Sequence, residues 1–412
     1  MKKVFLVTCC FVLLCCTVLA QGGKRFVNRV FNEIQSLKEI PYGAAAAVGD
    51  NEPETLYFDF YEPAEDTMSA RPLVITVFGG AFVAGNRGWS DMVAIADTLS
   101  HYGYAVASID YRLLPVLKLS GDNFIRTAYM AAQDISSAVR FFKGNAEKYR
   151  IDPSQIFLLG NSAGTIASLH FLYFGDDQRP EATYLEPDLG GVHTSGSPQY
   201  LDYSPSVAGV VAQWGCLLDT NLVDPYETTP VCLLHGTADK TVPYYSGVPY
   251  EEKLGSFLTG FLPTVYGSFF IERALTRYGI DHEFHTFIGE EHAFYLDGFS
   301  TIIPEKLDTC LKIAIRFMAK YNHYLNEELS VKNIDNQAVN IYPNPVSDFL
   351  EIELPEGVTD FSYTIYDVSG RKISKGTYNK NISVKVLKSG VYFLDIQDDN
   401  LKKKYKSKFV KY

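Results

Sequence analysis

The sequence has few cysteines outside its first 20 residues. Four of the seven lie within that segment, and Cys216, Cys232 and Cys310 lie beyond it. An odd number of cysteines does not suit a disulfide framework. Cys232 lies early in a predicted strand and Cys216 lies just beyond the preceding one. If those strands are parallel neighbours, the two sulfurs are about 15–20 Å apart, too far for a bond. We therefore expect no disulfide and ordinary core thiols.

Long apolar runs are also missing after residue 20, so no later stretch predicts a membrane span. Residues 1–20 have the pattern of a secretory signal peptide. Two lysines precede an apolar run, and Ala20 ends a small-residue cleavage site. An uncleaved membrane anchor is the alternative, because the run approaches spanning length. We expect cleavage near Ala20, passage through the periplasm, and a protein that is secreted or held at the cell surface.

Positive charge is scarce as well. The chain has 37 Lys and Arg against 48 Asp and Glu, a formal net charge of −11, and no basic stripe along its main body. Nucleic acids and anionic membranes attract proteins through clustered basic side chains. We therefore expect neither as a partner.

The most informative stretch is residues 155–174, QIFLLGNSAGTIASLHFLYF. An apolar run predicts a buried strand, Gly-Asn-Ser-Ala-Gly follows at 160–164, and apolar residues at helical spacing come next. A strand, Gly-x-Ser-x-Gly and a helix form the context of a nucleophile elbow, whose tight turn needs glycine on both sides. The pattern predicts Ser162 as an exposed nucleophile at a helix N-terminus. An ordinary strand-to-helix turn is the alternative.

A serine nucleophile requires a base and an acid that orients the base. In this architecture the acid and then the histidine follow the serine along the chain. Asp239 follows the predicted strand VCLLHGTA and His292 follows a predicted strand at 283–288. Carboxyl ends of parallel strands share one edge of a sheet, so both residues are expected beside Ser162. We interpret the remaining histidines as structural, including His235 inside its strand.

The negative oxygen of a tetrahedral intermediate requires backbone N–H donors. We expect them from Ala163, directly after the nucleophile, and from Gly80 and Ala81 in the loop after the predicted strand 73–78. A plain glycine turn is the alternative for that loop. Asp110 could serve as an acid by residue type, but it precedes Ser162. We interpret Asp110-Tyr111-Arg112 as a structural brace beneath the loop.

Strands alternate with helices over most of the chain, which predicts a mostly parallel sheet with helices on both faces, an α/β fold. Residues 21–54 carry little signal. Residues 326–338 are polar and aperiodic and are predicted to form a linker. Residues 339–412 have short alternating strands and turns, which predict a small all-β sandwich. The predicted catalytic domain therefore covers residues 21–325.

Five motifs in order, VFGGAFVAGNRG, DYRLLP, GNSAG, HGTADKTVP and GEEHAFY, resemble the α/β-hydrolase carboxylesterases over residues 55–320. They are most similar to the hormone-sensitive-lipase-like group and the bacterial feruloyl and acetylxylan esterases. The resemblance implies an α/β-hydrolase fold and a serine esterase that needs no metal and no organic cofactor. One departure is Phe78, which stands where the family usually has the histidine of His-Gly-Gly-Gly.

The segments IYPNPVSDFLEI, YDVSGRKI, LKSGVYFLDI and KSKFVKY resemble the type A C-terminal sorting domain of the type IX secretion system. This resemblance implies export across the outer membrane, the secretion machinery as a partner, and removal or anchoring of the tail. A carbohydrate-binding sandwich is the alternative.

Together these features predict a secreted serine carboxylesterase acting on short-chain acyl esters, such as acetyl or feruloyl groups on plant polysaccharide. A serine peptidase of the same fold and a non-catalytic surface binding or adhesion module are the alternatives. Two loops, 176–205 and 244–268, are candidate pocket walls because they are rich in aromatic residues. Those aromatic residues are Tyr184, Tyr200, Tyr203, Tyr244, Tyr245, Tyr250, Phe257 and Phe261.

Overall fold

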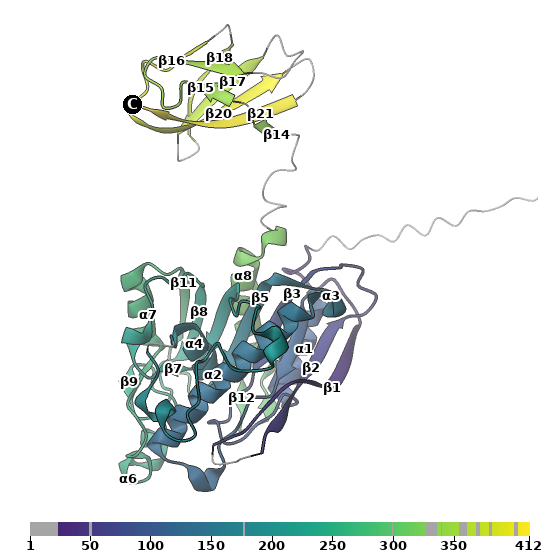
Figure 1. Ribbon diagram of the computed structural model, residues 1–412, viewed down its shortest axis with the longest axis vertical. Helices are drawn as coiled ribbons and strands as arrows, with labels where there is room; N and C mark the ends of the chain where they lie inside the picture. The colour runs from purple at the N-terminus through teal and green to yellow at the C-terminus, as the bar shows by residue number, and fades with distance from the viewer. Residues whose placement is uncertain are drawn as a thin grey trace, which may run out of the picture. The chain divides into compact units, whose positions relative to one another are not determined.

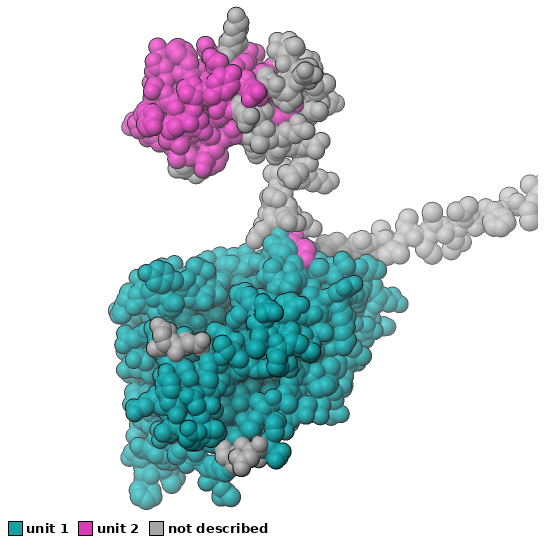
Figure 2. Space-filling view, in the orientation of Figure 1, with its two compact units in different colours: residues 1–323 teal, residues 324–412 magenta. Residues whose placement is uncertain are grey.

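The chain forms two compact units, Met1–His323 and Tyr324–Tyr412 (Figures 1 and 2). The computed structural model describes residues 24–325, apart from 49–51, 176–177 and 299, together with five C-terminal stretches. Those stretches are 336–353 apart from 339, 361–367, 371–378, 381–398 and 403–412. The predicted signal peptide and most of the predicted linker lie outside the described residues. The predicted domain limits therefore stay predictions.

An eight-stranded sheet forms the centre of the first unit. Its strands, in spatial order, are β1 (Ile34–Ala45), β2 (Glu54–Pro63), β4 (Ala105–Ile109), β3 (Arg71–Val77), β5 (Ile151–Asn161), β6 (Gly209–Gln213), β8 (Val231–Gly236) and β11 (His282–Phe287). The first two strands pair antiparallel, and every pairing from β4 to β11 is parallel. This mostly parallel arrangement confirms the predicted fold class.

Helices cover both faces of this sheet (Figure 1). The first face carries α2 (Gly121–Gly144), α4 (Ala163–Tyr173) and α7 (Ser268–Tyr278), and the opposite face carries α1 (Ser90–His101) and α8 (Pro304–Tyr321). Because both faces are covered, every residue of β3, β4 and β8 is buried. This burial explains why these strands read as continuous apolar runs rather than alternating ones.

Local signals position the ends of the long helices. Ser120 precedes α2, and its side chain accepts a hydrogen bond from the backbone N–H of Asn123, as an N-cap does. Gly279 ends α7 in a left-handed conformation with φ of 69°. The helix predicted over 123–149 is interrupted at Asn145, after which α3 (Ala146–Tyr149) forms a separate turn.

Two strands of the first unit differ from what their sequence signals indicate. Residues 21–54 carry little signal in the sequence and no strand was predicted there, but they contain β1, a 12-residue edge strand. Most of its residues are exposed and its pairing with β2 shifts register twice, so it lacks the alternation by which a half-buried strand is recognised. The mostly apolar run at 104–115, YAVASIDYRLLP, would suit one long strand, but β4 ends at Ile109 because residues 110–112 leave the sheet to make polar contacts elsewhere.

Small elements complete the first unit. Three short strands pair in the order β7 (Cys216–Leu217), β10 (Val265–Gly267) and β9 (Ser246–Gly247), and two more, β12 (Leu296–Asp297) and β13 (Thr301–Ile302), pair with each other. Two single-turn helices, α5 (Glu251–Leu254) and α6 (Ser256–Thr259), lie between β9 and β10. Cys216, Cys232 and Cys310 are free and buried. No helix among the described residues is long and apolar enough to cross a membrane.

The second unit consists of strands. One sheet has the order β14 (Asn336–Ala338), β21 (Lys403–Lys411), β20 (Gly390–Asp398), β17 (Ser362–Asp367) and β18 (Lys372–Thr377). The other has the order β15 (Asn340–Tyr342), β16 (Phe349–Glu353) and β19 (Ile382–Ser383). Alternate residues such as Leu350, Leu394 and Phe409 point inward and form one buried apolar cluster. These strands confirm the predicted all-β C-terminal domain.

Candidate active site

The nucleophile elbow forms where β5 meets α4. Ser162 joins them with φ of 50° and ψ of −119°, a backbone conformation that non-glycine residues rarely adopt. A Cβ on Gly164 would lie 2.0 Å from the carbonyl oxygen of Val77, and one on Gly160 would lie 2.6 Å from the backbone of Gly164. Only residues without a side chain allow α4 to start this close to β3. The structure therefore places Ser162 where the pattern predicts an elbow.

The structure brings the three predicted triad residues together. The Nε2 atom of His292 lies 2.9 Å from the hydroxyl oxygen of Ser162. The Nδ1 atom of the same ring lies 2.7 Å from Oδ2 of Asp239. Asp239 and His292 follow β8 and β11, and Ser162 follows β5, so all three stand at the carboxyl edge of the sheet.

The Asp239 carboxylate is buried and accepts four hydrogen bonds. Its Oδ1 atom accepts from the backbone N–H groups of Thr241 and Val242 at 2.8 and 2.9 Å. Its Oδ2 atom contacts His292 and, at 3.2 Å, Nε2 of a second histidine, His235. Burial alone would raise the pKa of Asp239, but the hydrogen bonds from the two histidines lower it well below its usual range. The carboxylate is therefore ionised at neutral pH.

His235 was interpreted as structural because it lies inside a predicted strand. The structure places it one residue before the end of β8, fully buried and within hydrogen-bond distance of the acid. The chain turns back directly after β8, which brings residue 235 next to residue 239. The His-x-x-x-Asp spacing at the end of a strand is the signal that could have revealed this contact.

The predicted oxyanion loop lies beside the nucleophile. A Cβ on Gly79 would lie 3.2 Å from the Cβ of Ser162, so the loop backbone is adjacent to the serine. Gly80 and Ala81 have φ of 107° and 57°, so both lie in the region that favours glycine. Ala163 is the first residue of α4, and the first N–H groups of a helix have no partner within the helix.

The predicted brace supports this loop from below. The hydroxyl of Tyr111 donates to the carbonyl oxygens of Phe78 and Gly79 at 3.0 and 3.2 Å. Its ring stacks on Phe78 with 4.2 Å between ring centroids. A Cβ on Gly85 would lie 2.5 Å from the Phe78 ring, so the loop folds tightly over that ring. Phe78 thus supports the loop by packing, where the family's histidine would offer a polar side chain.

Polar contacts explain the two residues that flank Tyr111. Asp110 contacts the guanidinium of Arg87 and accepts a hydrogen bond from the Arg87 backbone N–H at 3.1 Å. Arg112 forms a buried ion pair with Asp134 of α2 at 2.8 Å. Asp110 therefore anchors the end of the oxyanion loop and is not oriented toward His292.

A small cavity opens beside Ser162. The space inside it, counted together with its open mouth, is about 230 Å³. Ala81 and Ala163, two of the three predicted oxyanion donors, line it together with the serine. The remaining wall is mostly apolar and consists of Phe82, Phe124, Ile166, Val242, Pro249 and Tyr250.

Comparison with known proteins agrees with this geometry. Residues 58–224 match the family BD-FAE, and residues 340–411 match the family described as secretion system C-terminal sorting domain. Over 160 residues, the chain is 31% identical to a probable isoprenylcysteine alpha-carbonyl methylesterase of Oryza sativa subsp. japonica. A similar methylesterase of Arabidopsis thaliana is 27% identical over 164 residues. The first unit is therefore similar to esterases of these kinds over part of its length.

These alignments cover 39% and 40% of this chain and 32% and 33% of the two relatives, so the chain spans about a third of their length. Among solved structures, a truncated carbohydrate esterase from gut microbiota is 20% identical, with a TM-score of 0.46. That alignment covers 70% of this chain and 96% of the other. The sorting domain implies export through the type IX secretion system to the cell surface or the exterior.

One residue of a predicted pocket wall, Tyr200, lies far from the cavity. Tyr200 contacts Phe141 and Asn145 at the C-terminal end of α2, whereas Phe124 lines the cavity near the start of that helix. Twenty residues of helix separate those positions by about 30 Å. The expectation that the 176–205 loop lines the pocket is therefore wrong for Tyr200. In the second predicted wall, Tyr250 does line the cavity.

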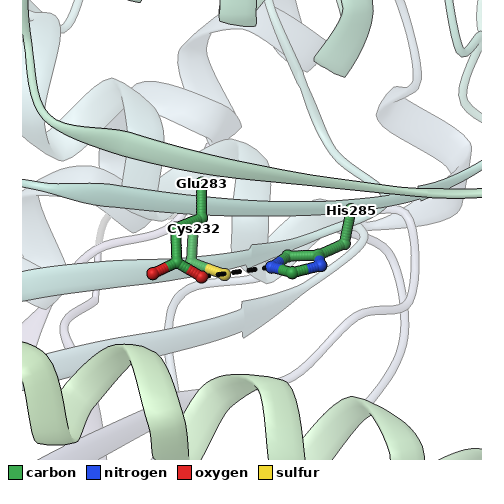
Figure 3. A group of neighbouring side chains, drawn as sticks. All are labelled: Cys232, Glu283 and His285. Atoms are coloured by element: carbon green, nitrogen blue, oxygen red, sulfur yellow. Dashed lines mark hydrogen bonds and ion pairs between the residues drawn. The ribbon is translucent and has the colours of Figure 1, made fainter.

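Within the described part of the hydrolase unit, one group of side chains has metal-ligand character, Cys232, Glu283 and His285 (Figure 3). Their donor atoms lie within 4.8 Å of one another on the neighbouring strands β8 and β11. Zinc requires a thiolate, but burial raises the pKa of Cys232 and the charge of Glu283 raises it further. Glu283 already pairs with His285 at 3.2 Å. We assign no metal to this group.

The close approach at Gly164 leads to a stability prediction. We expect Gly164→Ala to destabilise the hydrolase unit by about 3 kcal/mol or more, because its methyl group would collide with the Val77 carbonyl. A gain in helix propensity of about 0.5–1 kcal/mol cannot offset that collision. Chemical denaturation measures the effect. Gly43→Ala is the control, since its methyl group would meet its nearest atom at 3.4 Å. Equal stability of the two variants would contradict this account of the elbow.

Proposed function

We propose that this protein is a secreted serine carboxylesterase with Ser162 as nucleophile, His292 as base and Asp239 as the acid that orients the base. The observation that supports the proposal most directly is the hydrogen-bonded chain Ser162–His292–Asp239, with distances of 2.9 and 2.7 Å. A hydroxyl is a weak nucleophile unless a base is within hydrogen-bond reach and a third group holds that base.

In the first half of the reaction, the Ser162 oxygen attacks the carbonyl carbon of the ester and its proton passes to Nε2 of His292. The resulting imidazolium carries Nδ1–H toward the ionised Asp239, which stabilises the positive charge. The negative oxygen of the tetrahedral intermediate is stabilised by the N–H of Ala163 and by those of Gly80 and Ala81. His292 then donates its proton to the departing alcohol as the bond from carbon to the alcohol oxygen breaks.

In the second half, water takes the place of the alcohol. His292 accepts a proton from the water while the water oxygen attacks the acyl-enzyme carbonyl. Collapse of this second intermediate returns the proton to Ser162 and releases the carboxylic acid. Only groups of this chain and water take part in these steps.

The cavity beside Ser162 supports a short acyl group. Phe124, Ile166 and Tyr250 narrow an apolar space of about 230 Å³ that includes the mouth. An acetyl to butyryl chain buries its few methyl and methylene groups there. The matched relatives have names that range from methylesterases and carboxylesterases to a lipase, so ester hydrolysis is what they share.

The alcohol part of the substrate is proposed to be a neutral sugar or aryl group, such as those of acylated plant polysaccharide. The chain's net charge of −11 disfavours the approach of an anionic alcohol. Tyr245 and Phe261 are half-exposed and Phe257 is almost fully exposed. All three belong to the predicted pocket wall 244–268. Such rings can stack on sugar or phenolic rings.

The nucleophile assignment is tested by Ser162→Ala. We expect turnover of p-nitrophenyl acetate to fall by about 10⁴-fold or more, because the substitution removes the hydroxyl that lies 2.9 Å from the base His292. Thermal unfolding should be nearly unchanged, since the substitution removes one oxygen. Activity close to that of the unaltered protein would disprove the mechanism.

The acyl preference is tested with p-nitrophenyl esters of increasing chain length. We expect the unaltered protein to prefer acetyl to butyryl chains, and Phe124→Ala to shift the preference to longer chains, because the substitution removes a cavity wall. Phe142→Ala is the matched control, a buried phenylalanine of the same helix about 27 Å farther along it. A preference for eight or more acyl carbons in the unaltered protein would contradict the short-chain proposal.

The role of the second unit is tested by ending the chain at residue 325. We expect the shortened protein to fold and keep its esterase activity, because the triad and cavity residues all belong to the first unit. In the native host it should accumulate in the periplasm. Normal delivery of the shortened protein to the cell surface would show that the sorting domain is not required for export.

A further inference from the structure

Two histidines share one oxygen of the acid. His292 lies 2.7 Å from Oδ2 of Asp239, and His235 reaches the same oxygen at 3.2 Å from the opposite side of the strand end. His235 is fully buried and lies outside the chain of hydrogen bonds that ends at Ser162. The proposed mechanism assigns no role to this second imidazole, although both of its ring nitrogens lie within hydrogen-bond distance of polar groups.

The contacts of His235 define where its proton lies. Its Nε2 atom lies 3.2 Å from the Asp239 carboxylate and 3.1 Å from the carbonyl oxygen of Val242. Both oxygens are acceptors, so Nε2 carries the hydrogen and donates to them. Its Nδ1 atom lies 2.8 Å from the hydroxyl of Ser268, which can donate to it. Ser268 is the first residue of α7 and is buried, so it holds the ring in this orientation.

We propose that His235 is a positioning residue of the esterase, which uses its Nε2–H to hold the Asp239 carboxylate and the Val242 carbonyl in the geometry that His292 and the acyl cavity require. This inference rests on the proposed function, because Asp239 matters only if it orients the base. The single N–H links the acid to Val242, a residue of the cavity wall. One imidazole thereby aligns the proton-transfer chain with the acyl site.

A neutral donor suits this position better than a cation would. A second imidazolium at Asp239 would compensate the carboxylate's charge and weaken its stabilisation of the imidazolium that forms at His292. A neutral N–H orients the carboxylate and leaves its charge available. The Ser268 hydroxyl can donate to Nδ1, which is compatible with a neutral ring that carries its proton on Nε2.

Two other titratable side chains interact with this carboxylate, Cys216 and Tyr250. Burial raises the pKa of Cys216 and of Tyr250, and the charge of Asp239 raises both further. Tyr244 contacts the His235 ring edge-on, with 5.6 Å between centroids.

Two variants separate the donor from the shape of the side chain. His235→Phe keeps a ring but removes the N–H, and His235→Gln keeps an N–H donor near the Nε2 position. For His235→Phe we expect kcat to fall about 10–100-fold, as when a hydrogen bond to a charged group is lost. KM should stay within about twofold, because His235 does not contact the substrate. His235→Gln should recover most of kcat.

The pH profile distinguishes positioning from a purely structural role. The acid limb of kcat/KM reports protonation of the coupled Asp239–His292 pair. With one donor fewer on the carboxylate, the pair holds its proton more tightly, so the limb should move to higher pH by about 0.5–1 unit in His235→Phe. It should stay in place in His235→Gln.

The matched control is His170→Gln. His170 is also fully buried and hydrogen-bonded on both ring nitrogens, to the Ile166 carbonyl and the Leu218 N–H, and burial lowers its pKa to about 4. This variant should lose thermal stability without moving the acid limb. If His170→Gln moves the limb as much as His235→Phe does, or if His235→Phe leaves both kcat and the limb unchanged, the proposal is overturned.

A measurement that needs no activity separates this inference from the proposed function. The chain has 8 histidines, so ¹⁵N-histidine labelling of the full mature protein gives few resonances, and His235→Gln identifies the one that belongs to residue 235. We expect the ¹⁵N shifts of a neutral ring protonated at Nε2 between pH 6 and 8. A ring protonated at Nδ1 overturns the inference. An inactive unaltered protein with an Nε2–H ring would instead refute the esterase proposal and leave the contact intact.

Discussion

The position of the Ser162 hydroxyl depends on the close approach of α4 to β3, which glycine alone permits. A side chain at residue 164 would have to occupy the space of the Val77 carbonyl oxygen, 2.0 Å away. The same approach fixes the strained backbone of the serine and places Ala163 at a helix N-terminus. The nucleophile, one oxyanion donor and the oxyanion loop after β3 are thus held by one close approach, between the start of α4 and the end of β3.

A second centre of organisation is the buried carboxylate of Asp239. Four donors surround it, two from the backbone of the following turn and two from histidines on β8 and after β11. An ionised carboxylate is stable in such a buried place only when its oxygens are satisfied by donors. The donors keep it charged, and they also join the loops after β8 and β11, which lie more than 50 residues apart in the chain. Electrostatics and loop geometry are therefore set by the same contacts.

Much of this arrangement was predictable because the relevant signals are local. The elbow needs two glycines at fixed spacing around a serine, and the buried strands are continuous apolar runs. Asp239 and His292 follow directly from the rule that carboxyl ends of parallel strands share an edge. The edge strand β1 escaped prediction because its exposed residues and register shifts leave no periodicity. Tyr200 was expected near the pocket because aromatic composition says nothing about which end of α2 a loop contacts.

The sequence by itself determined the order of strands and helices, the identity of the nucleophile's turn, and the change of composition that separates the α/β unit from the all-β unit. Each of these depends on residues that are neighbours in the chain. The tertiary structure decided which polar groups contact one another: His235 contacts Asp239, Ser268 contacts His235, and Tyr111 donates to a carbonyl of the oxyanion loop. The contacts of Ser268 and Tyr111 arise from the packing of elements far apart in the chain. At Asp239 the His-x-x-x-Asp spacing is a local signal, but only the turn after β8 brings the two side chains together.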